Sequence, residues 1–111
     1  MLEKLWNDIR LIYEGLSFSG KLLVDDLMIM SQDNYYQLYY KQDDITTQIR
    51  IEKNYSLVNM WSGEKEIDII DYKLWVEVDS KIELDENYKI ELTYNIITPF
   101  LRECKLNKIG V

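Results

Sequence analysis

The sequence predicts an α+β protein in which an N-terminal amphipathic helix packs on a curved antiparallel sheet of about six meandering strands. Apolar residues recur at three- and four-residue steps near the N-terminus, whereas they recur at every second position over most of the remaining chain. Short polar breaks separate the alternating stretches, which favours hairpins between neighbouring strands. The length of 111 residues fits one domain covering 1–111.

The first element is expected to be a helix from about residue 2 to about residue 15. Its apolar stripe consists of Leu2, Leu5, Trp6, Ile9, Ile12, Tyr13 and Leu16. Lys4 and Asp8 fall outside this stripe, one turn apart, and can form an ion pair. Gly15 or Gly20 is the expected stop signal.

The strands are predicted from residue patterns of two kinds. Strict alternation of apolar and polar side chains occurs at 45–52, 72–79 and 88–96. Less regular strand-like runs occur at 21–31, 35–41, 55–61 and 66–71. Turn residues separate these runs at Asp33-Asn34, Gln42-Asp43-Asp44, Lys53-Asn54, Ser62-Gly63 and Asp85-Glu86-Asn87. Such alternation is typical of a sheet with one dry and one wet face.

The tail favours a short C-terminal helix, with an extended tail as the alternative. Thr98 is placed to cap the helix and Pro99 to occupy its first position. Cys104 then falls on an apolar edge and is expected to be a small core residue.

The composition argues against most enzyme chemistry, and we expect no enzyme, no cofactor and no metal site. The chain has no histidine, the commonest general base, and one cysteine, Cys104. Glycines are not spaced for a phosphate-binding loop. The adjacent carboxylates Asp25-Asp26, Asp43-Asp44 and Asp85-Glu86 are interpreted as solvated turn residues, because neighbours on a strand point to opposite faces. A single cysteine and an N-terminus without a signal-peptide pattern favour the cytoplasm.

The charge distribution points to a basic partner. The net charge is −7, and the segment 64–91 holds ten carboxylates against four lysines. Such a field opposes contact with nucleic acid or an anionic membrane and attracts cationic proteins. The alternative is a solvated sheet face whose charges prevent aggregation.

Aromatic side chains on the wet face are candidate anchors for that partner. If Leu74 and Val76 point into the core, Trp75 points outward among charged neighbours, and Tyr35 and Tyr39 do the same on another strand. The alternative is that a second layer, such as the C-terminal cap or a dimer mate, covers these rings.

These observations favour a small acidic interaction protein that binds and neutralises a basic protein, such as an immunity protein for a toxin or an inhibitor of a nucleic-acid enzyme. No direct contact with nucleic acid or membrane is expected, and a homodimer is a further candidate assembly. The predicted partner-binding residues are Glu66, Asp68, Trp75, Glu77, Asp79, Glu83, Asp85, Tyr35 and Tyr39. The alternative function is a small-molecule-binding module whose pocket between helix and sheet is lined by Trp6, Tyr13, Tyr88, Tyr94 and the four methionines.

Overall fold

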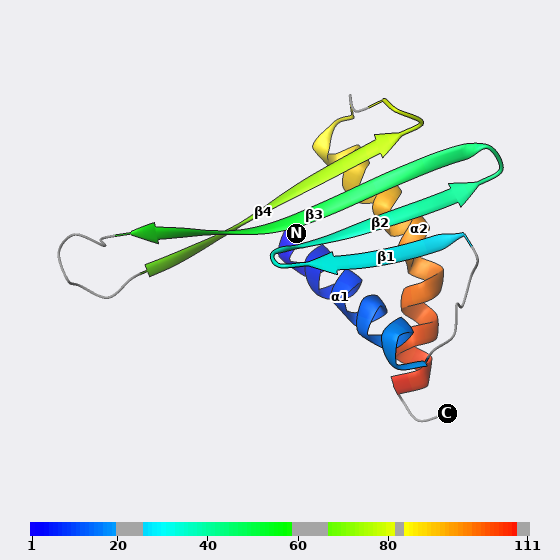
Figure 1. The fold of residues 1–111 in the computed structure, drawn as a ribbon, viewed down its shortest axis with the longest axis horizontal. Coiled ribbons are helices and arrows are strands. Elements are labelled where there is room, and N and C mark those ends of the chain that lie inside the picture. Colours follow the sequence, from blue (N-terminus) through cyan, green and yellow to red (C-terminus); the bar gives the residue numbers. More distant parts are fainter. Residues whose placement is uncertain (20–25, 59–66, 82–83, 109–111) are drawn as a thin grey trace.

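The computed structural model describes residues 1–19, 26–58, 67–81 and 84–108, and within them it has two helices and a four-stranded antiparallel sheet (Figure 1). The elements are α1 (Leu2–Ser19), β1 (Leu27–Gln32), β2 (Tyr35–Gln42), β3 (Ile45–Val58), β4 (Ile67–Val78) and α2 (Glu86–Lys108). The strand order is β1-β2-β3-β4, a meander in which each strand pairs with its neighbour in sequence. The α+β class and the antiparallel sheet are therefore confirmed.

Helix α1 forms where the apolar stripe predicts it, runs past Gly15 and ends at Ser19, the residue before the alternative stop signal Gly20. Leu5, Ile9 and Ile12 are fully buried, and Lys4 pairs with Asp8 over 3.1 Å. Gly15 lies inside the helix, where the absence of a side chain leaves room for α2. A Cβ built there would lie 2.9 Å from Sγ of Cys104. The glycine thus serves helix packing and does not end the helix.

The prediction of about six strands is wrong, since the described sheet has four. The break expected at Lys53-Asn54 does not occur, because both residues are paired with β4, opposite Tyr72 and Asp71. The runs 45–52 and 55–61 therefore contribute to one strand, β3, and the runs 66–71 and 72–79 contribute to β4. Of the run 21–31, the part from Leu27 lies in β1, and residues 21–25 lie outside the described residues.

The turns between the first three strands are confirmed. Asp33 and Asp43 adopt positive φ angles of 27° and 56°, in two-residue connections that close the β1–β2 and β2–β3 hairpins. Aspartate tolerates this left-handed region better than most residues. Ser62-Gly63 lies outside the described residues.

The strand predicted at 88–96 is wrong, because this segment belongs to helix α2. Thr93, Ile97 and Leu101 are buried at four-residue steps, with Phe100 and Cys104 on the same side. The helix begins at Glu86 where a turn was expected, and the carbonyl of the preceding residue, Asp85, accepts the amide of Lys89 over 2.9 Å. Isoleucine, tyrosine and threonine fit either period, so packing against α1 and β4 selects the helix.

The C-terminal helix is long, and its expected start at Thr98 is also wrong. Pro99 lies inside α2, and the Thr98 hydroxyl donates to the carbonyl of Tyr94 one turn earlier instead of capping a helix. The single helix expected over the sheet is therefore replaced by a pair.

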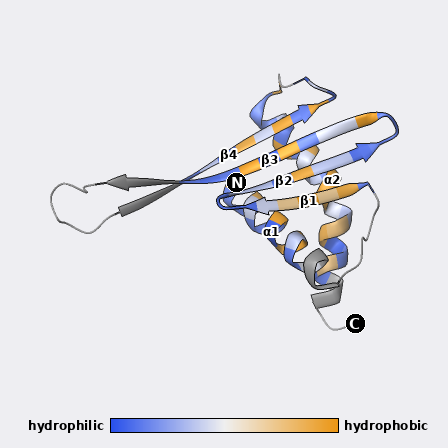
Figure 2. Cartoon of the chain, in the orientation of Figure 1, coloured by the Kyte–Doolittle hydropathy of each residue, from blue (hydrophilic) through white to orange (hydrophobic). Residues whose placement is uncertain are grey.

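Both helices lie on the same side of the sheet, and the core fills the space between them (Figure 1). Hydrophobic and hydrophilic residues alternate along the coloured part of β3 (Figure 2), whereas the first four residues of β1, Leu27–Met30, are all hydrophobic. The inward strand residues of the buried core are Leu27, Tyr36, Leu38, Ile49, Ile51, Leu74 and Val76. In the described part of the chain, neither helix has an apolar stretch sufficient to cross a bilayer.

Candidate functional site: the outer face of the sheet

The side of the sheet that faces away from the helices is not covered by any other described element, and we call it the outer face. The pleat places every second strand residue on it. Its members include Met28, Met30, Gln32, Tyr35, Gln37, Tyr39, Lys41, Thr46, Gln48, Arg50, Glu52, Lys73, Trp75 and Glu77.

Trp75 lies in this face with 41% of its surface exposed, although tryptophan is one of the most costly side chains to leave in water. The strand register places it directly opposite Arg50, which in turn lies opposite Gln37 on β2. The outward orientation of Trp75, Tyr35 and Tyr39 agrees with the alternation of the sequence.

Arg50 occupies the centre of the outer face and links its aromatic rings. Its guanidinium carbon lies 4.0 Å from the ring centroid of Tyr35 and 6.0 Å from that of Trp75. Its Nε lies 2.9 Å from Oε1 of Glu52, an ionic contact whose angle does not make a hydrogen bond. Cation–π attraction and the ion pair together hold the arginine flat against the sheet.

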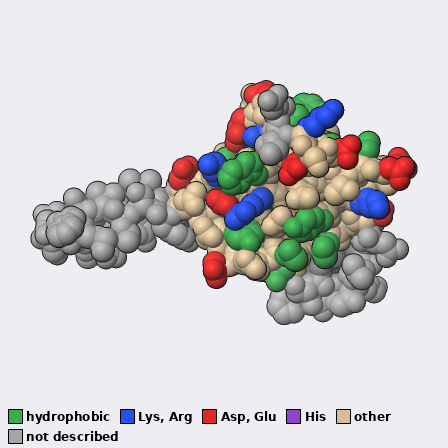
Figure 3. All heavy atoms as spheres, turned by 45° about the horizontal axis from the view of Figure 1, so that its top comes forward, with side chains coloured by type: hydrophobic (Ala, Val, Ile, Leu, Met, Phe, Trp, Pro, Cys, Tyr) green, Lys and Arg blue, Asp and Glu red, His purple; other side chains and the backbone are tan. Residues whose placement is uncertain are grey.

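The charges around Trp75 are mixed in sign. Lys73 Nζ lies 4.8 Å from its ring centroid, and Glu77 follows two residues later on the same strand. In Figure 3, hydrophobic, basic and acidic side chains are interspersed over the visible face. Trp75 therefore has Arg50 and Lys73 near its ring, and the carboxylates of Glu52 and Glu77 belong to the same face.

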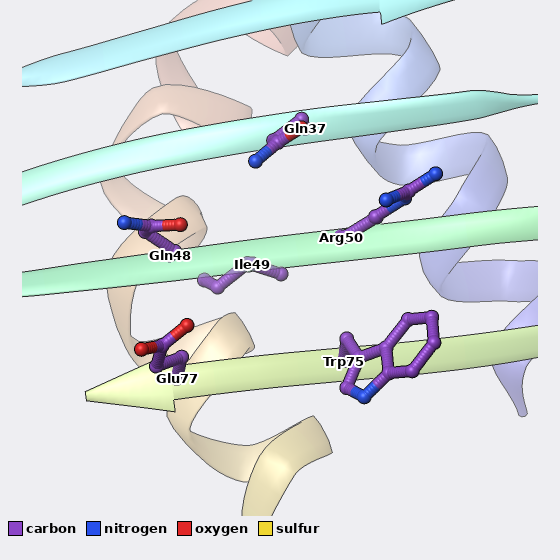
Figure 4. A pocket seen from close by; sticks show the side chains of 6 residues that line it. All are labelled: Gln37, Gln48, Ile49, Arg50, Trp75 and Glu77. Atoms are coloured by element: carbon purple, nitrogen blue, oxygen red, sulfur yellow. The ribbon is translucent and has the colours of Figure 1, made fainter. Parts of the chain in front are cut away.

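A depression of about 290 Å³ lies in the middle of the outer face. It is lined by Gln37, Gln48, Ile49, Arg50, Trp75 and Glu77, whose side chains come from β2, β3 and β4 (Figure 4). Two amides, a guanidinium and a carboxylate supply both donors and acceptors around the indole. A depression of this kind can hold one polar or aromatic side chain of another protein.

The two outward tyrosines of β2, Tyr35 and Tyr39, each make a local hydrogen bond. The Tyr35 hydroxyl donates to Oε1 of Gln32, and Nε2 of Gln37 donates to the Tyr39 hydroxyl over 2.8 Å. These bonds restrict the rotamers of the two tyrosine side chains.

The predicted acidic residues are only partly brought to this face. Glu77 lies on it, Asp79 lies in the turn after β4 with a φ of 49°, and Asp85 directly precedes α2. Asp68 is opposite Leu57 in the β3–β4 ladder, but its side chain lies outside the described residues, as do Glu66 and Glu83 altogether.

Sequence reasoning missed Arg50, Gln37 and Gln48 as members of the site. Their alternation with buried neighbours indicates outward orientation, but only the register across three strands shows that they surround Trp75. The turn predicted at Gln42-Asp43-Asp44 fits the β2–β3 register, but the break expected at Lys53-Asn54 concealed the continuous β3–β4 pairing that places Arg50 opposite Trp75.

The residues named for a pocket between helix and sheet are spread over core and surface. The rings of Trp6 and Tyr13 pack on Tyr36, with centroids 4.7 and 5.5 Å away; Trp6 belongs to the core, and Tyr13 is partly buried against it. Tyr88 is exposed, and the Tyr94 hydroxyl donates to Asp8 over 2.9 Å. Three of the four methionines, Met1, Met28 and Met30, are exposed, and Met60 lies outside the described residues.

Cys104 and the carboxylates form no reactive cluster among the described residues. Burial raises the pKa of the Cys104 thiol, and Glu103 raises it further. Within the described ranges, no three carboxylate or thiol side chains are grouped to hold a metal ion.

Comparisons with known proteins return no relative for this chain: no family model, no curated protein and no solved structure matches it.

Proposed function

We propose that this chain binds and neutralises a basic protein through the outer face of its sheet, as an immunity protein does for a toxin or an inhibitor for a nucleic-acid enzyme. The observation that carries the proposal is Trp75, which is 41% exposed on a face that no other described element covers. An exposed tryptophan held among ordered polar side chains resembles the anchor residues that dominate protein interfaces.

The net charge of the molecule supports a basic partner, although the charges nearest Trp75 do not. Arg50 and Lys73 adjoin Trp75, so the centre of the face does not attract cations by itself. The net charge of −7, with Glu77, Asp79 and Asp85 near the end of β4 and beyond, supplies the long-range attraction. We infer that the carboxylates speed the encounter and that the aromatic centre supplies the affinity.

Affinity capture at low salt, followed by elution in a salt gradient, identifies the partner. The kinetics of the purified pair then test the proposed surface. Trp75→Ala is expected to raise the dissociation rate at least about tenfold, since a truncated anchor costs on the order of 2 kcal/mol. Simultaneous reversal of Glu77, Asp79 and Asp85 to lysine is expected to lower the association rate about tenfold at low salt, and less at high salt.

The matched control reverses Glu3, Glu91 and Glu103, which are exposed on the helices. This variant changes the net charge by the same amount on other elements of the fold. An equal loss of association rate in both triple variants would show that net charge alone attracts the partner, and unchanged dissociation of the Trp75 variant would remove the anchor from the proposal.

A further inference from the structure

The depression on the outer face carries charges of opposite sign at its two ends. Glu77 and Gln48 lie directly opposite each other at one end, which we call the Glu77 end. Arg50 and Trp75, likewise opposite each other, lie at the other end (Figure 4). The two pairs are two residues apart along the strands, which corresponds to about 7 Å. The two charges can therefore be considered separately.

The positive charge of Arg50 is compensated within the chain. Its Nε lies 2.9 Å from Oε1 of Glu52, and its guanidinium carbon lies 4.0 Å from the ring centroid of Tyr35. Glu52 lies two residues from Arg50 along β3, in the direction away from Gln48, and Tyr35 lies opposite Glu52. The guanidinium is therefore engaged on the side away from Glu77, which reduces its attraction for an incoming anion.

The negative charge of Glu77 has no such compensation. In the described part of the chain, neither its carboxylate nor the side-chain amide of Gln48 makes a hydrogen bond or an ion pair. Two lysines lie near this end. Lys41 is on β2, two strands and about 10 Å from β4. Lys81 is bridged to Val78, which packs on the core, so its side chain starts on the helix side of the sheet.

We propose that the Glu77 end of the depression binds one arginine side chain, which in the proposed complex belongs to the basic partner. The inference rests on the proposed function and names the group that this depression receives. The guanidinium pairs with the Glu77 carboxylate and donates to the side-chain oxygen of Gln48, while the methylene stem lies beside the Trp75 indole. The volume of about 290 Å³ is sufficient for one such side chain.

The arrangement of acceptors favours arginine over lysine. Because Glu77 and Gln48 are directly opposite, their Cβ atoms lie about 5 Å apart across the strands. A planar guanidinium donates in several directions and reaches both side chains, whereas an ammonium is a compact and strongly hydrated charge. Arg50 and Lys73 already adjoin the indole, so the guanidinium is kept at the carboxylate and the stem alone contacts Trp75.

Titration of N-acetyl-arginine amide into the isotope-labelled full chain, at constant ionic strength, tests the site by NMR. The indole N–H signal of Trp75 is the reporter, and Trp75→Phe assigns it among the three tryptophans. We expect saturable millimolar binding, at least about threefold tighter than that of N-acetyl-lysine amide. Glu77→Gln is expected to weaken it at least about fivefold, and the control Glu91→Gln, at an exposed position of α2, by less than about twofold.

Three results of this titration would overturn the proposal. They are the absence of a saturable shift, equal affinities of the arginine and lysine probes, and equal effects of Glu77→Gln and Glu91→Gln. Tighter binding of N-acetyl-glutamate amide would also overturn it, because Arg50 would then be the group that receives the ligand.

The purified pair of this chain and its captured partner separates the arginine site from the proposed function. Glu77→Gln is expected to raise the dissociation rate about fivefold even at high salt, whereas Asp79→Asn, with the same loss of charge two residues away, stays within about twofold. Equal dissociation rates of these variants, with a weakened Trp75→Ala complex, would refute the arginine site and support the proposed function. Probe binding that depends on Glu77, without any captured basic protein, would support the site and refute the proposed function.

Discussion

Gly15 offers the sharpest test of how the two helices pack. An alanine Cβ at this position would lie 2.9 Å from Sγ and 3.7 Å from Cβ of Cys104 on α2. The first separation is shorter than van der Waals contact allows, and the second is ordinary contact. Cys104 is buried, so its sulfur has little free space into which to move.

Two effects of Gly15→Ala oppose each other. Alanine stabilises a helix interior by about 1 kcal/mol relative to glycine. Forcing extra volume into a packed site costs about 1–3 kcal/mol. We therefore expect the free energy of unfolding to fall by about 0–2 kcal/mol in the natural chain. In a Cys104→Ala background the sulfur is gone, and the same substitution is expected to raise the free energy of unfolding by about 1 kcal/mol.

Urea denaturation of the four chains of this double-mutant cycle, under reducing conditions, measures the coupling between the two positions. The expected coupling is about 1–3 kcal/mol, with opposite signs for Gly15→Ala in the two backgrounds. Stabilisation by Gly15→Ala in both backgrounds would refute the close approach of α1 and α2 at this point.

Three further predictions concern the core, the helix pair and pH. Ile49 is fully buried, so Ile49→Ala is expected to lower the free energy of unfolding by about 2–5 kcal/mol in urea titrations. Trp75→Ala is expected to change the free energy of unfolding by less than half as much. Tyr94→Phe removes the hydrogen bond to Asp8 and is expected to cost about 1 kcal/mol by thermal melting. Burial raises the pKa of Cys104 and of Tyr94 above their ordinary values, so both groups hold their protons longer in the folded state than in the unfolded one. Stability is therefore expected to be complete below about pH 8.5 and to fall as the pH rises through the folded-state values, with the first part of the loss absent in Cys104→Ala.

Much of the strand arrangement follows from local sequence. Alternation predicts that Leu74 and Val76 are buried and Trp75 exposed, because successive strand residues must point to opposite faces. The aspartates at 33 and 43 predict tight turns, because they accept left-handed backbone angles. The stripe of α1 and the burial of Cys104 are likewise contained in residue spacing.

The identity of α2 shows where local sequence is insufficient. Residues 88–96 alternate as a strand would, yet they are helical. Thr93 and Ile97 are buried four residues apart, which is the spacing of one face of a helix. β-Branched and aromatic side chains satisfy both patterns, and contacts made by distant segments decide between them.

The assembly of the outer face also depended on the tertiary structure. Spacing along the chain gave Trp75 and Arg50 an outward direction, but it could not bring them together. Their contact arises from the register between β3 and β4. These strands pair without a break through Lys53 and Asn54, so no turn residue close to Arg50 or Trp75 indicates that register. Directions of side chains are local properties of a strand, whereas neighbours across a sheet depend on how separate segments align.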